Sequence, residues 1–321
     1  MKEITIDKAN EGQRIEKFVR RFLSEAPLGF IYKAFRKKDI KVNGHWVHKD
    51  AILHEGDVVR IYVTDQQMAD FAKPKEVEAK PLNHPIVYED ENVLFVDKPA
   101  GLLVMGDEHE KRVTLVNDVL SYLYGKGEFN PRNHAFVPAP AHRLDRNTSG
   151  IVCFGKTDAA LKELTALFKE RENIDKRYLA LVVGVPENEG SIDAPLLKDA
   201  KTGLVKVSPE GKEAHTKYRL LETNGEVSLI ECELLTGRTH QIRVHLSSIG
   251  HPIIGDGKYG DFEMNRLYKN KYGVNYQFLI AHSLTFKQTS GVLSDLKGKT
   301  FKNALTSEQK SLLKRLNVCK I

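Results

Sequence analysis

The sequence predicts an α+β protein in which a small unit of two helices and a hairpin precedes a larger unit built around a sheet. Three observations support this prediction. Helical and strand-like patterns follow one another closely within residues 1–63. A polar stretch that contains prolines and lacks apolar periodicity then separates them from the rest of the chain. Beyond it, strand-like runs alternate irregularly with helices, without the strict rhythm of a parallel α/β fold.

Length and composition limit the class of protein. With 321 residues and 41% hydrophobic content, the chain can form one large domain and a smaller one. No apolar run approaches the roughly 20 residues of a membrane helix, and the opening segment MKEITIDKAN lacks the apolar region of a signal peptide. Cys153, Cys232 and Cys319 lie far apart and form no CxxC pair, which argues against a disulfide framework. We therefore expect a soluble, cytoplasmic protein without a membrane partner.

Positive charge is concentrated near the N-terminus. The formal net charge is +6, and residues 1–63 hold 13 Lys and Arg against 9 Asp and Glu, a net +4. This excess is modest, and a run of charges is commonly only a solvated face. The arrangement of the charges must therefore decide whether they bind nucleic acid.

Two helices are predicted in this basic region. Residues 14–23 carry apolar side chains at helical spacing, opposite charged ones, which indicates one buried stripe: Ile15, Phe18, Val19, Phe22 and Leu23. After the break at Pro27 and Gly29, a second short helix is expected over residues 30–38. Three of its basic residues share one exposed face and form a stripe suited to phosphate groups: Lys33, Arg36 and Lys37.

Two short β segments, KVNGHWV and DVVRIYV, complete the unit through the turn HEGD, where Gly56 supplies conformational freedom. With VNG after the basic helix and EGD before the last strand, residues 12–63 resemble the small RNA-binding domain of ribosomal protein S-four. The resemblance implies an RNA-binding domain over residues 1–64. A hairpin without an RNA role is the alternative, but the charge lies where that family uses it.

A linker and a second domain follow. Residues 65–83 are polar, charged and interrupted by prolines, which is typical of a linker. Residues 84–321 contain strand-like runs such as NVLFVDK, GIVCFGK, RYLALVVG and VSLIECELL, and a helix around residues 159–170. We expect these residues to form a single larger domain.

The stretch PAPAHRLDRNTSGIVCFGKT contains the first candidate for chemistry. Proline-limited coil comes first, turn-forming residues follow, and a hydrophobic strand begins at Ile151. Asp145 is therefore predicted on a loop that leads into the core. The ordinary alternative is an aspartate that caps its own turn and is balanced by Arg143 and Arg146.

HRLD, followed after two residues by TSG, resembles the signature of the RluA-type pseudouridine synthases. KPAG (residues 98–101), KRYLALV (176–182) and GRTHQIRVHLSSIGHPIIGDGKYG (237–260) are similar to further blocks of that family, in the same order. The resemblance implies a large mixed, mostly antiparallel sheet with flanking helices and a central cleft. It also implies isomerisation of uridine to pseudouridine in RNA, with no metal and no cofactor. Asn147 and Met105 depart from the residues that the family often has there, which leaves the role of the Met105 loop open.

Three further segments narrow the resemblance: PLLKDAKTGLVKVSPEGKEAHTKYRLLE, YGDFEMNRL and FLIAHSLTF. They are similar to members of the family that modify RNA of the large ribosomal subunit. The implied partner is structured RNA, of the 23S ribosomal type. We expect the chain to act as a monomer without a small-molecule cofactor.

The reaction needs a carboxylate near the sugar or the base, and the resemblance assigns this part to Asp145. Attack on C1′, attack on the base and abstraction of a sugar proton all use such a group, and the sequence leaves the three routes open. A carboxylate in a dry cleft stays ionised only beside a cation. Residues 239–249 have helical features, with Thr239 as a possible cap, Ile242, Leu246 and Ile249 on one face, and Gly250 as a stop signal. The resemblance implies that Arg243, off the apolar stripe, pairs with Asp145.

The resemblance implies roles for three more residues. Tyr178 packs against the target base and moves its proton; a tyrosine of the hydrophobic core is the alternative. Because the target uridine is flipped out of folded RNA, Arg143 fills the vacated place with its flat guanidinium. An ion pair with Asp145 is the alternative for Arg143. Arg238 is a candidate contact for RNA phosphate.

Other functions have weaker support. Five histidines match no common spacing of metal ligands, so we expect structural or RNA-facing roles: His142, His240, His245, His251 and His282. GDGKYG satisfies GxGxxG, but no strand–helix–strand unit surrounds it, so a dinucleotide site is rejected. A serine hydrolase at Ser149 lacks the expected motif. A non-catalytic RNA-binding or ribosome-assembly protein would share the charge pattern, but Asp145, Tyr178 and Arg243 argue against it.

Overall fold

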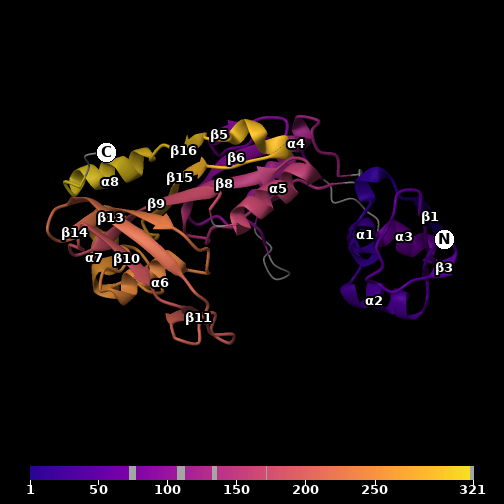
Figure 1. Cartoon of the computed structure of the whole chain (residues 1–321), viewed down its shortest axis with the longest axis horizontal. Helices are drawn as coiled ribbons and strands as arrows, with labels where there is room; N and C mark the ends of the chain where they lie inside the picture. The colour runs from indigo at the N-terminus through magenta and orange to yellow at the C-terminus, as the bar shows by residue number, and fades with distance from the viewer. Residues whose placement is uncertain (72–76, 107–112, 132–135, 171, 319–321) are drawn as a thin grey trace. The chain divides into compact units, whose positions relative to one another are not determined.

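The computed structural model describes residues 1–71, 77–106, 113–131, 136–170 and 172–318. The chain divides into two compact units, Met1–Pro81 with Leu120–Val137 and Leu82–Val119 with Pro138–Ile321. Figure 1 shows the elements of both units. Helix α4 (Leu115–Gly125) runs across the division. Among the described residues, no helix has the length and apolar character needed to cross a membrane.

The first unit combines short helices with a four-stranded antiparallel sheet of order β1-β4-β2-β3. Its elements are β1 (Lys2–Thr5), η1 (Lys8–Asn10), α1 (Ile15–Phe22), α2 (Leu28–Arg36), β2 (Ile40–Val42), β3 (His45–Trp46), β4 (Val58–Ile61) and α3 (Asp65–Phe71). The apolar stripe predicted for the first helix is buried, as Ile15, Phe18 and Val19 show. Both predicted helices are therefore present, with α2 beginning two residues earlier than expected.

The strands of this unit differ from the prediction. KVNGHWV is itself a hairpin of β2 and β3, because Asn43 and Gly44 take positive φ angles of 51° and 83°. Two such residues in succession fit the tight turn whose twist matches a hairpin. Strand β4 pairs with β2 and also with β1, which was not predicted. The segment KEIT is too short to show a clear alternation.

Helix α3 lies within the stretch expected to be a linker. Met68 and Phe71 pack against the hydrophobic core of the first unit, and the rings of Phe30 and Phe71 are 4.7 Å apart. The backbone N–H of Glu25 donates to the carbonyl of Phe71 at 3.1 Å. Residues 65–71 are thus an ordered helix and not a free linker. Two apolar residues three positions apart are too few to show helical periodicity in the sequence.

The second unit is built on a ten-stranded sheet with the main order β10-β13-β14-β9-β15-β8-β6-β5, in which β16 pairs with β15 and β7 with β8. Within the described residues, β15 and β8 are parallel and the other pairs are antiparallel. This confirms the predicted large mixed, mostly antiparallel sheet. The strands are β5 (Ile86–Glu89), β6 (Val93–Lys98), β7 (Ala139–Pro140), β8 (Ser149–Gly155), β9 (Ile174–Val183), β10 (Glu189–Asp193), β13 (His215–Thr223), β14 (Val227–Leu234), β15 (Leu279–Phe286) and β16 (Thr300–Lys302).

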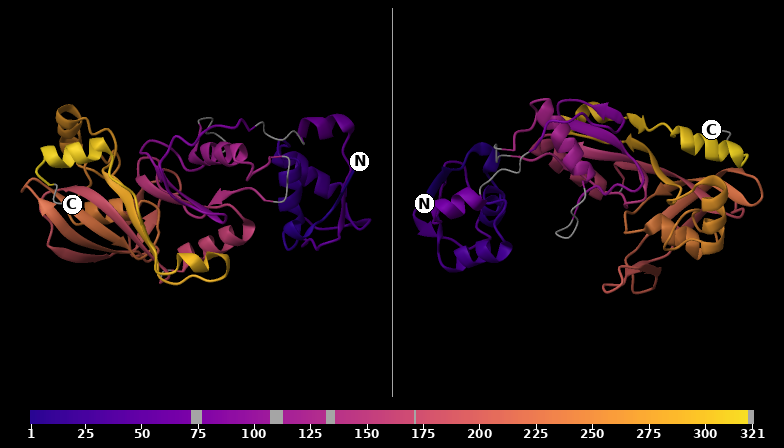
Figure 2. Two further views of the ribbon diagram at one scale, coloured as in Figure 1. Left: turned by 90° about the horizontal axis from the view of Figure 1, so that it is seen from above. Right: turned by 180° about the vertical axis from the view of Figure 1, so that it is seen from behind.

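Helices cover both faces of this sheet. They are α5 (Asp158–Lys169), α6 (Gln241–Ser248), α7 (Phe262–Tyr272), η2 (Gly291–Leu296) and α8 (Ser307–Arg315). Side chains alternate along β9, so Leu179 and Leu181 pack with α7 and α8, whereas Ala180 and Val182 pack with α6. A separate two-stranded hairpin, β11 (Leu196–Lys198) and β12 (Val205–Val207), extends from this unit beyond α6 in Figures 1 and 2.

One position in the middle of the sheet aligns two segments that are far apart in the sequence. Ala281 of β15 pairs with Gly150 of β8 on one side and with Tyr178 of β9 on the other. Gly150 has a φ of +116°, and a Cβ there would collide with the backbone of Ala281. Glycine therefore allows this close parallel approach. The loop that precedes β8 consequently lies beside Tyr178.

Candidate active site

The loop that carries Asp145 is fixed on both sides of that residue. Before it, the ring Nε2 of His142 accepts a hydrogen bond from the backbone N–H of Cys153 at 3.2 Å. After it, the backbone N–H of Thr148 donates to the carbonyl of Asp145 at 3.1 Å, and Gln277 donates to the Thr148 hydroxyl at 2.7 Å. The carboxyl group of Asp145 thus projects from a backbone that is held in place.

Lys98, from the KPAG block, joins this loop to its neighbour. Its side chain is fully buried, and its ammonium group donates to the carbonyls of Pro99, Leu102 and Arg146 at 2.9, 2.9 and 3.0 Å. Burial lowers the pKa of Lys98 to about 7, against the opposing charge of Asp145. The three bonds tie the loop after β6 to the residue that follows Asp145.

Asp145, Arg243 and Asp256 form a continuous charged chain. Arg243 donates from Nη1 to Oδ2 of Asp145 at 2.8 Å, and from Nε and Nη2 to both carboxylate oxygens of Asp256 at 2.7 and 2.8 Å. The side chains of Arg243 and Asp256 are 7% and 1% exposed, whereas that of Asp145 is 28% exposed. The structure therefore brings Arg243 against Asp145, and anchors it from behind.

The charges of this chain support one another. Burial opposes the charged form of Arg243, but its bonds to Asp256 and Asp145 outweigh burial and raise the pKa of the guanidinium. Burial would likewise raise the pKa of Asp256, yet Arg243 and two backbone N–H groups lower it. Arg243 and Asp256 are therefore both ionised at neutral pH.

Helix α6, which carries Arg243, begins differently from the prediction. His240 is the residue that precedes the helix, with a left-handed φ of 54°, and Thr239 provides no cap. The buried side chain of Gln241 fixes this turn instead, because it accepts from the backbone N–H of Arg238 at 3.0 Å and from the Thr236 hydroxyl at 2.7 Å. A local cap was predicted, but these bonds reach outside the helix.

The predicted apolar face of α6 is also only partly correct. Ile242 and Leu246 are buried, whereas Ile249 is 37% exposed. Gly250 follows the end of the helix with a φ of +83°, as expected of a stop signal. Helix α6 spans Gln241–Ser248, so it is shorter at both ends than the predicted helix of residues 239–249.

Tyr178 points from β9 toward the face covered by α6, where it packs with Ala180 and its neighbours. Burial raises the pKa of Tyr178 well above its usual value, and the negative charge of Asp145 adds to the shift. The phenol is therefore protonated at neutral pH and is able to donate a hydrogen bond. Strand position thus places Tyr178 in the neighbourhood of Asp145.

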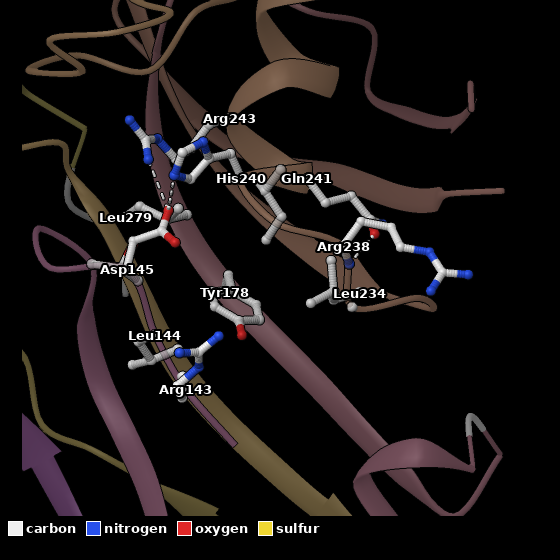
Figure 3. A pocket seen from close by; sticks show the side chains of 13 residues that line it. Arg143, Leu144, Asp145, Tyr178, Leu234, Arg238, His240, Gln241, Arg243 and Leu279 are labelled. Carbon is white, nitrogen blue, oxygen red and sulfur yellow. Dashed lines mark hydrogen bonds and ion pairs between the residues drawn. The ribbon is translucent and has the colours of Figure 1, made fainter. Parts of the chain in front are cut away.

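A pocket opens around these residues. One cavity of about 450 Å³ adjoins a smaller one of about 120 Å³, and the larger falls within the range of ligand pockets. Met105 lines the larger cavity. Figure 3 shows the smaller cavity, with Asp145, Tyr178 and Arg143 along one side. The residues that line both are Arg143, Leu144, Asp145, Tyr178, Leu234, Gly237, Arg238 and His240.

The two predicted RNA-contacting arginines take different positions at this pocket. Arg143 is exposed, and in the described part of the chain it makes no ion pair with Asp145, whose neighbours are the guanidinium of Arg243 and the imidazole of His240. In Figure 3, its guanidinium lies near Tyr178. Arg238 donates to the carbonyl of Glu213 at 2.9 Å, and its guanidinium points away from Asp145. Both arginines therefore lie at the rim.

The other predicted RNA-binding residues belong to the first unit. Lys33 and Arg36 lie on α2, Lys37 ends that helix, and all three are exposed. Basic side chains near a helix C-terminus also stabilise the helix dipole. The exposed stripe expected from the sequence is therefore present, although a purely structural role would give the same positions.

Sequence reasoning missed two residues that support the site. Asp256 and Tyr259 lie in GDGKYG, which ends the family block of residues 237–260 and was rejected as a dinucleotide motif, but neither residue was given a role. Asp256 anchors Arg243, and the Tyr259 hydroxyl lies 2.7 Å from Nδ1 of His240. The useful signal was that this segment belongs to the same family block as Arg243. Five histidines were grouped as structural or RNA-facing, but only His240 of that group approaches Asp145 among the described residues.

Comparison with known proteins gives consistent results. A family model described as RNA pseudouridylate synthase matches residues 92–248. The ribosomal large subunit pseudouridine synthase C of Vibrio cholerae serotype O1 is 36% identical over 290 residues, which cover 88% of this chain and 88% of that protein. The protein of the same name from Escherichia coli (strain K12) is 37% identical over 290 residues, with 88% and 87% covered.

A solved structure shares the fold. The human RNA pseudouridylate synthase domain containing 4 superposes with a TM-score of 0.59 at 25% identity, covering 74% of this chain and 94% of that chain. The matched family range includes Asp145, Tyr178 and Arg243, while Asp256 lies beyond it.

Proposed function

The chain belongs to the RNA pseudouridylate synthase family, and we propose that it isomerises uridines of large-subunit ribosomal RNA at a site built on Asp145. It is an enzyme that converts uridine in RNA to pseudouridine. The relatives from Vibrio cholerae and Escherichia coli, named for the large ribosomal subunit, support this choice of RNA. Modification of ribosomal RNA would place the enzyme in the cytoplasm.

The reaction defines what the site must do. The bond between N1 of the base and C1′ breaks, the base turns, and a bond forms between C5 and C1′. The C5 proton leaves and N1 regains one, so no net oxidation occurs. A carboxylate beside the sugar or base can act as nucleophile or base in this sequence. We propose that the protein acts as a monomer without a small-molecule cofactor.

The position of the Asp145 carboxylate is the observation that carries the assignment. Its Oδ2 receives the hydrogen bond from Arg243. In the part of the chain that the structure describes, no protein group donates to Oδ1. Asp145 also lines both cavities beside Tyr178. An ionised carboxylate with one oxygen held and the other open to a pocket is suited to attack or to proton abstraction.

We assign the neighbouring residues accordingly. Tyr178 packs against the flipped base and, because its phenol is protonated, donates a hydrogen bond there. Arg143 fills the place that the base leaves in the RNA. This role is supported by the exposure of its side chain and by the lack of an ion pair with Asp145 among the described residues. Arg238 contacts phosphate at the rim. Residues 1–64 bind RNA through Lys33, Arg36 and Lys37, whereas residues 84–321 carry the reaction.

Replacement of one oxygen tests the central assignment. Asp145→Asn keeps the shape of the side chain but removes its charge, so we expect pseudouridine formation in large-subunit ribosomal RNA to fall at least about a thousandfold, by analogy with the loss of a catalytic group. RNA affinity, measured by filter binding, should change little. Asp158→Asn, at an exposed position on α5, serves as the matched control. Turnover that survives in Asp145→Asn would reject the assignment.

The RNA substrate needs a separate measurement. Pseudouridines are mapped chemically across ribosomal and transfer RNA from cells that lack the gene, and then from cells that regain wild type or Asp145→Asn. We expect sites in large-subunit ribosomal RNA to disappear and to return only with wild type. Loss of sites only in transfer RNA would contradict the proposed substrate and leave the reaction itself intact.

A further inference from the structure

The segment of residues 255–260 supports both side chains that approach the Asp145 carboxylate. Asp256 holds Arg243 through two hydrogen bonds of 2.7 and 2.8 Å. Tyr259 contacts His240, whose Nδ1 lies 2.7 Å from the phenol oxygen. Both partners come from a turn of four residues that follows α6.

His240 is held between Tyr259 and Asp145. Its side chain is 13% exposed, and its Nε2 lies 3.8 Å from Oδ2 of Asp145. The rings of His240 and Tyr259 meet edge to face, with centroids 5.4 Å apart. Its left-handed backbone, with a φ of 54°, turns the side chain toward the pocket at the start of α6. One ring nitrogen therefore faces the phenol. The other faces the carboxylate of Asp145 (Figure 3).

The hydrogen bonds of Tyr259 indicate where the imidazole proton lies. The phenol oxygen accepts from the backbone N–H of Val205 at 3.0 Å, which leaves its own proton to donate to Nδ1 of His240. A neutral imidazole has one donor and one acceptor nitrogen. With Nδ1 as acceptor, Nε2 carries the proton and directs it at the Asp145 carboxylate. The other tautomer would direct a lone pair at that negative charge.

We propose that His240 is a positioning residue for Asp145, kept by Tyr259 as the neutral tautomer with its proton on Nε2. Together with Arg243, it draws Oδ2 to one side, so that Oδ1 stays turned toward the pocket. This role rests on the proposed function, because it matters only if Asp145 reacts. It adds no new step to the reaction and forms no bond to RNA.

The charges around His240 agree with a neutral ring. Burial lowers its pKa, and Arg243 and Lys258 lower it further, against the opposing effects of Asp145 and Asp256. Protonation in acid would place a second hydrogen on Nδ1, which could then no longer accept from Tyr259. The arrangement around Asp145 is therefore expected to hold at neutral pH and to be disturbed in acid.

Two substitutions at His240 distinguish the roles of its two ring nitrogens. In position, the amide nitrogen of glutamine approximates Nε2 of histidine, whereas the amide of asparagine reaches only to the level of Nδ1. Asparagine is also the side chain that tolerates a left-handed backbone better. If only the fold needed His240, His240→Asn would be the milder change. If Asp145 needs the Nε2 proton, His240→Gln will be the milder one.

We expect His240→Asn to lower kcat about tenfold, equivalent to about 1.4 kcal/mol, with KM for RNA unchanged. His240→Gln should stay within about threefold of wild type. Equal loss in both variants, or a larger loss in His240→Gln, would overturn the proposal. Circular dichroism and melting temperature of each variant report whether it folds.

A spectroscopic measurement keeps the proposal testable without turnover. Long-range ¹H–¹⁵N correlation of the histidine rings in the full chain shows which nitrogen is protonated, and His240→Asn identifies the signals of His240. We expect a bare Nδ1 and a protonated Nε2 at pH 7. The guanidinium of Arg243 lies over the ring of Tyr259, 5.0 Å from its centroid. Tyr259→Phe keeps this ring but removes the hydroxyl, so the tautomers should mix and kcat should fall about tenfold. A protonated Nδ1 in wild type would overturn the proposal.

The two proposals fail in different ways. If Asp145→Asn stays active, the catalytic assignment is lost whatever the tautomer of His240. If Asp145→Asn is inactive but Tyr259→Phe keeps both the wild-type tautomer and the wild-type kcat, Asp145 retains its role and the positioning by His240 is rejected.

Discussion

At the scale of single residues, the two oxygens of Asp145 have different surroundings. Oδ2 accepts a hydrogen bond from Arg243 and faces His240. The other oxygen, Oδ1, is turned to the pocket (Figure 3). The need for a cation beside this carboxylate was predictable from desolvation alone. Its identity as Arg243 came from a family resemblance. Asp256, which anchors the cation, could not be predicted, because nothing in a turn sequence shows which buried side chain it will meet.

Replacement of Arg143 tests the filling of the gap in RNA. Arg143→Ala should lower turnover on a duplexed target about tenfold or more, because flipping costs a few kcal/mol that a stacked guanidinium offsets. A short single strand that contains the same uridine should be affected much less. Arg143→Lys, which keeps the charge without the flat group, should behave like Arg143→Ala. Initial rates on both RNAs provide the measurement.

Arg266→Ala, at an exposed position on α7, controls for general loss of positive charge. Equal slowing of Arg143→Ala on duplex and single strand would assign Arg143 to ordinary phosphate binding.

His142 should make stability depend on pH. Burial lowers its pKa to about 3, and its ring stacks on Phe168 with centroids 4.1 Å apart. Between the unfolded value near 6.5 and about 3, the unfolded chain binds more protons than the folded one, so stability falls as pH falls. His142→Phe keeps a stacking ring but has no nitrogen that can take up a proton.

The stability advantage of wild type over His142→Phe should therefore shrink by up to about 1.4 kcal/mol per pH unit below pH 6. Urea unfolding at pH 7.5, 6 and 5 measures it. A constant difference across this range would show that His142 takes up a proton in the folded chain as readily as in the unfolded one, which would contradict the lowered pKa.

At the scale of elements, the helices of the first unit followed the apolar pattern, because Ile15, Phe18 and Val19 recur at helical spacing and are buried. The start of α6 did not follow its local sequence. Thr239 was a plausible cap, but Gln241 reaches Thr236 and the adjoining strand, and thereby fixes the turn. Contacts between elements decided that geometry, and local propensity contains no information about them.

The turn after α6 should be essential to the helix that it supports. Asp256→Asn removes one charge from a buried ion pair and leaves only one of the two acceptor oxygens that hold Arg243. The free energy of unfolding should therefore fall by about 3 kcal/mol. Turnover should fall as well, because Arg243 can then leave Asp145. Urea unfolding and initial rates test both effects.

The exposed Asp295→Asn is the matched control for Asp256→Asn. Full stability in Asp256→Asn would show that Asp145 alone is sufficient to hold the guanidinium.

At the scale of the whole molecule, the α+β class was predictable, since irregular alternation of strands and helices excluded a parallel α/β fold. The mixed sheet was implied by the family resemblance. The pairing of β8 with β15 was not predictable. These strands are about 130 residues apart along the chain, and Gly150 permits their approach for a reason visible only in the structure. Helix α3, within the expected linker, was missed because Met68 and Phe71 form too short a pattern.

The charge of the first unit should govern salt dependence. Lys33, Arg36 and Lys37 are replaced together by alanine. The slope of log affinity for large RNA against log salt concentration should then become less steep by about 2 to 3, because each lost phosphate contact changes it by about 0.9. The control removes three other exposed lysines of the same unit, Lys2, Lys8 and Lys17. Equal slopes in wild type and the first variant would refute RNA binding by α2, and equal effects of both variants would show a general effect of charge.

The chain Asp256–Arg243–Asp145 also has a consequence for the order of folding. Arg243 is 13 residues from Asp256 but 98 residues from Asp145. Closing the longer loop costs about 2 kcal/mol more in chain entropy. We therefore expect Arg243 to meet Asp256 first and Asp145 to dock onto a cation that is already in place. Asp145 would then be the last of these three residues to join the site, although it is the first of them to be synthesised.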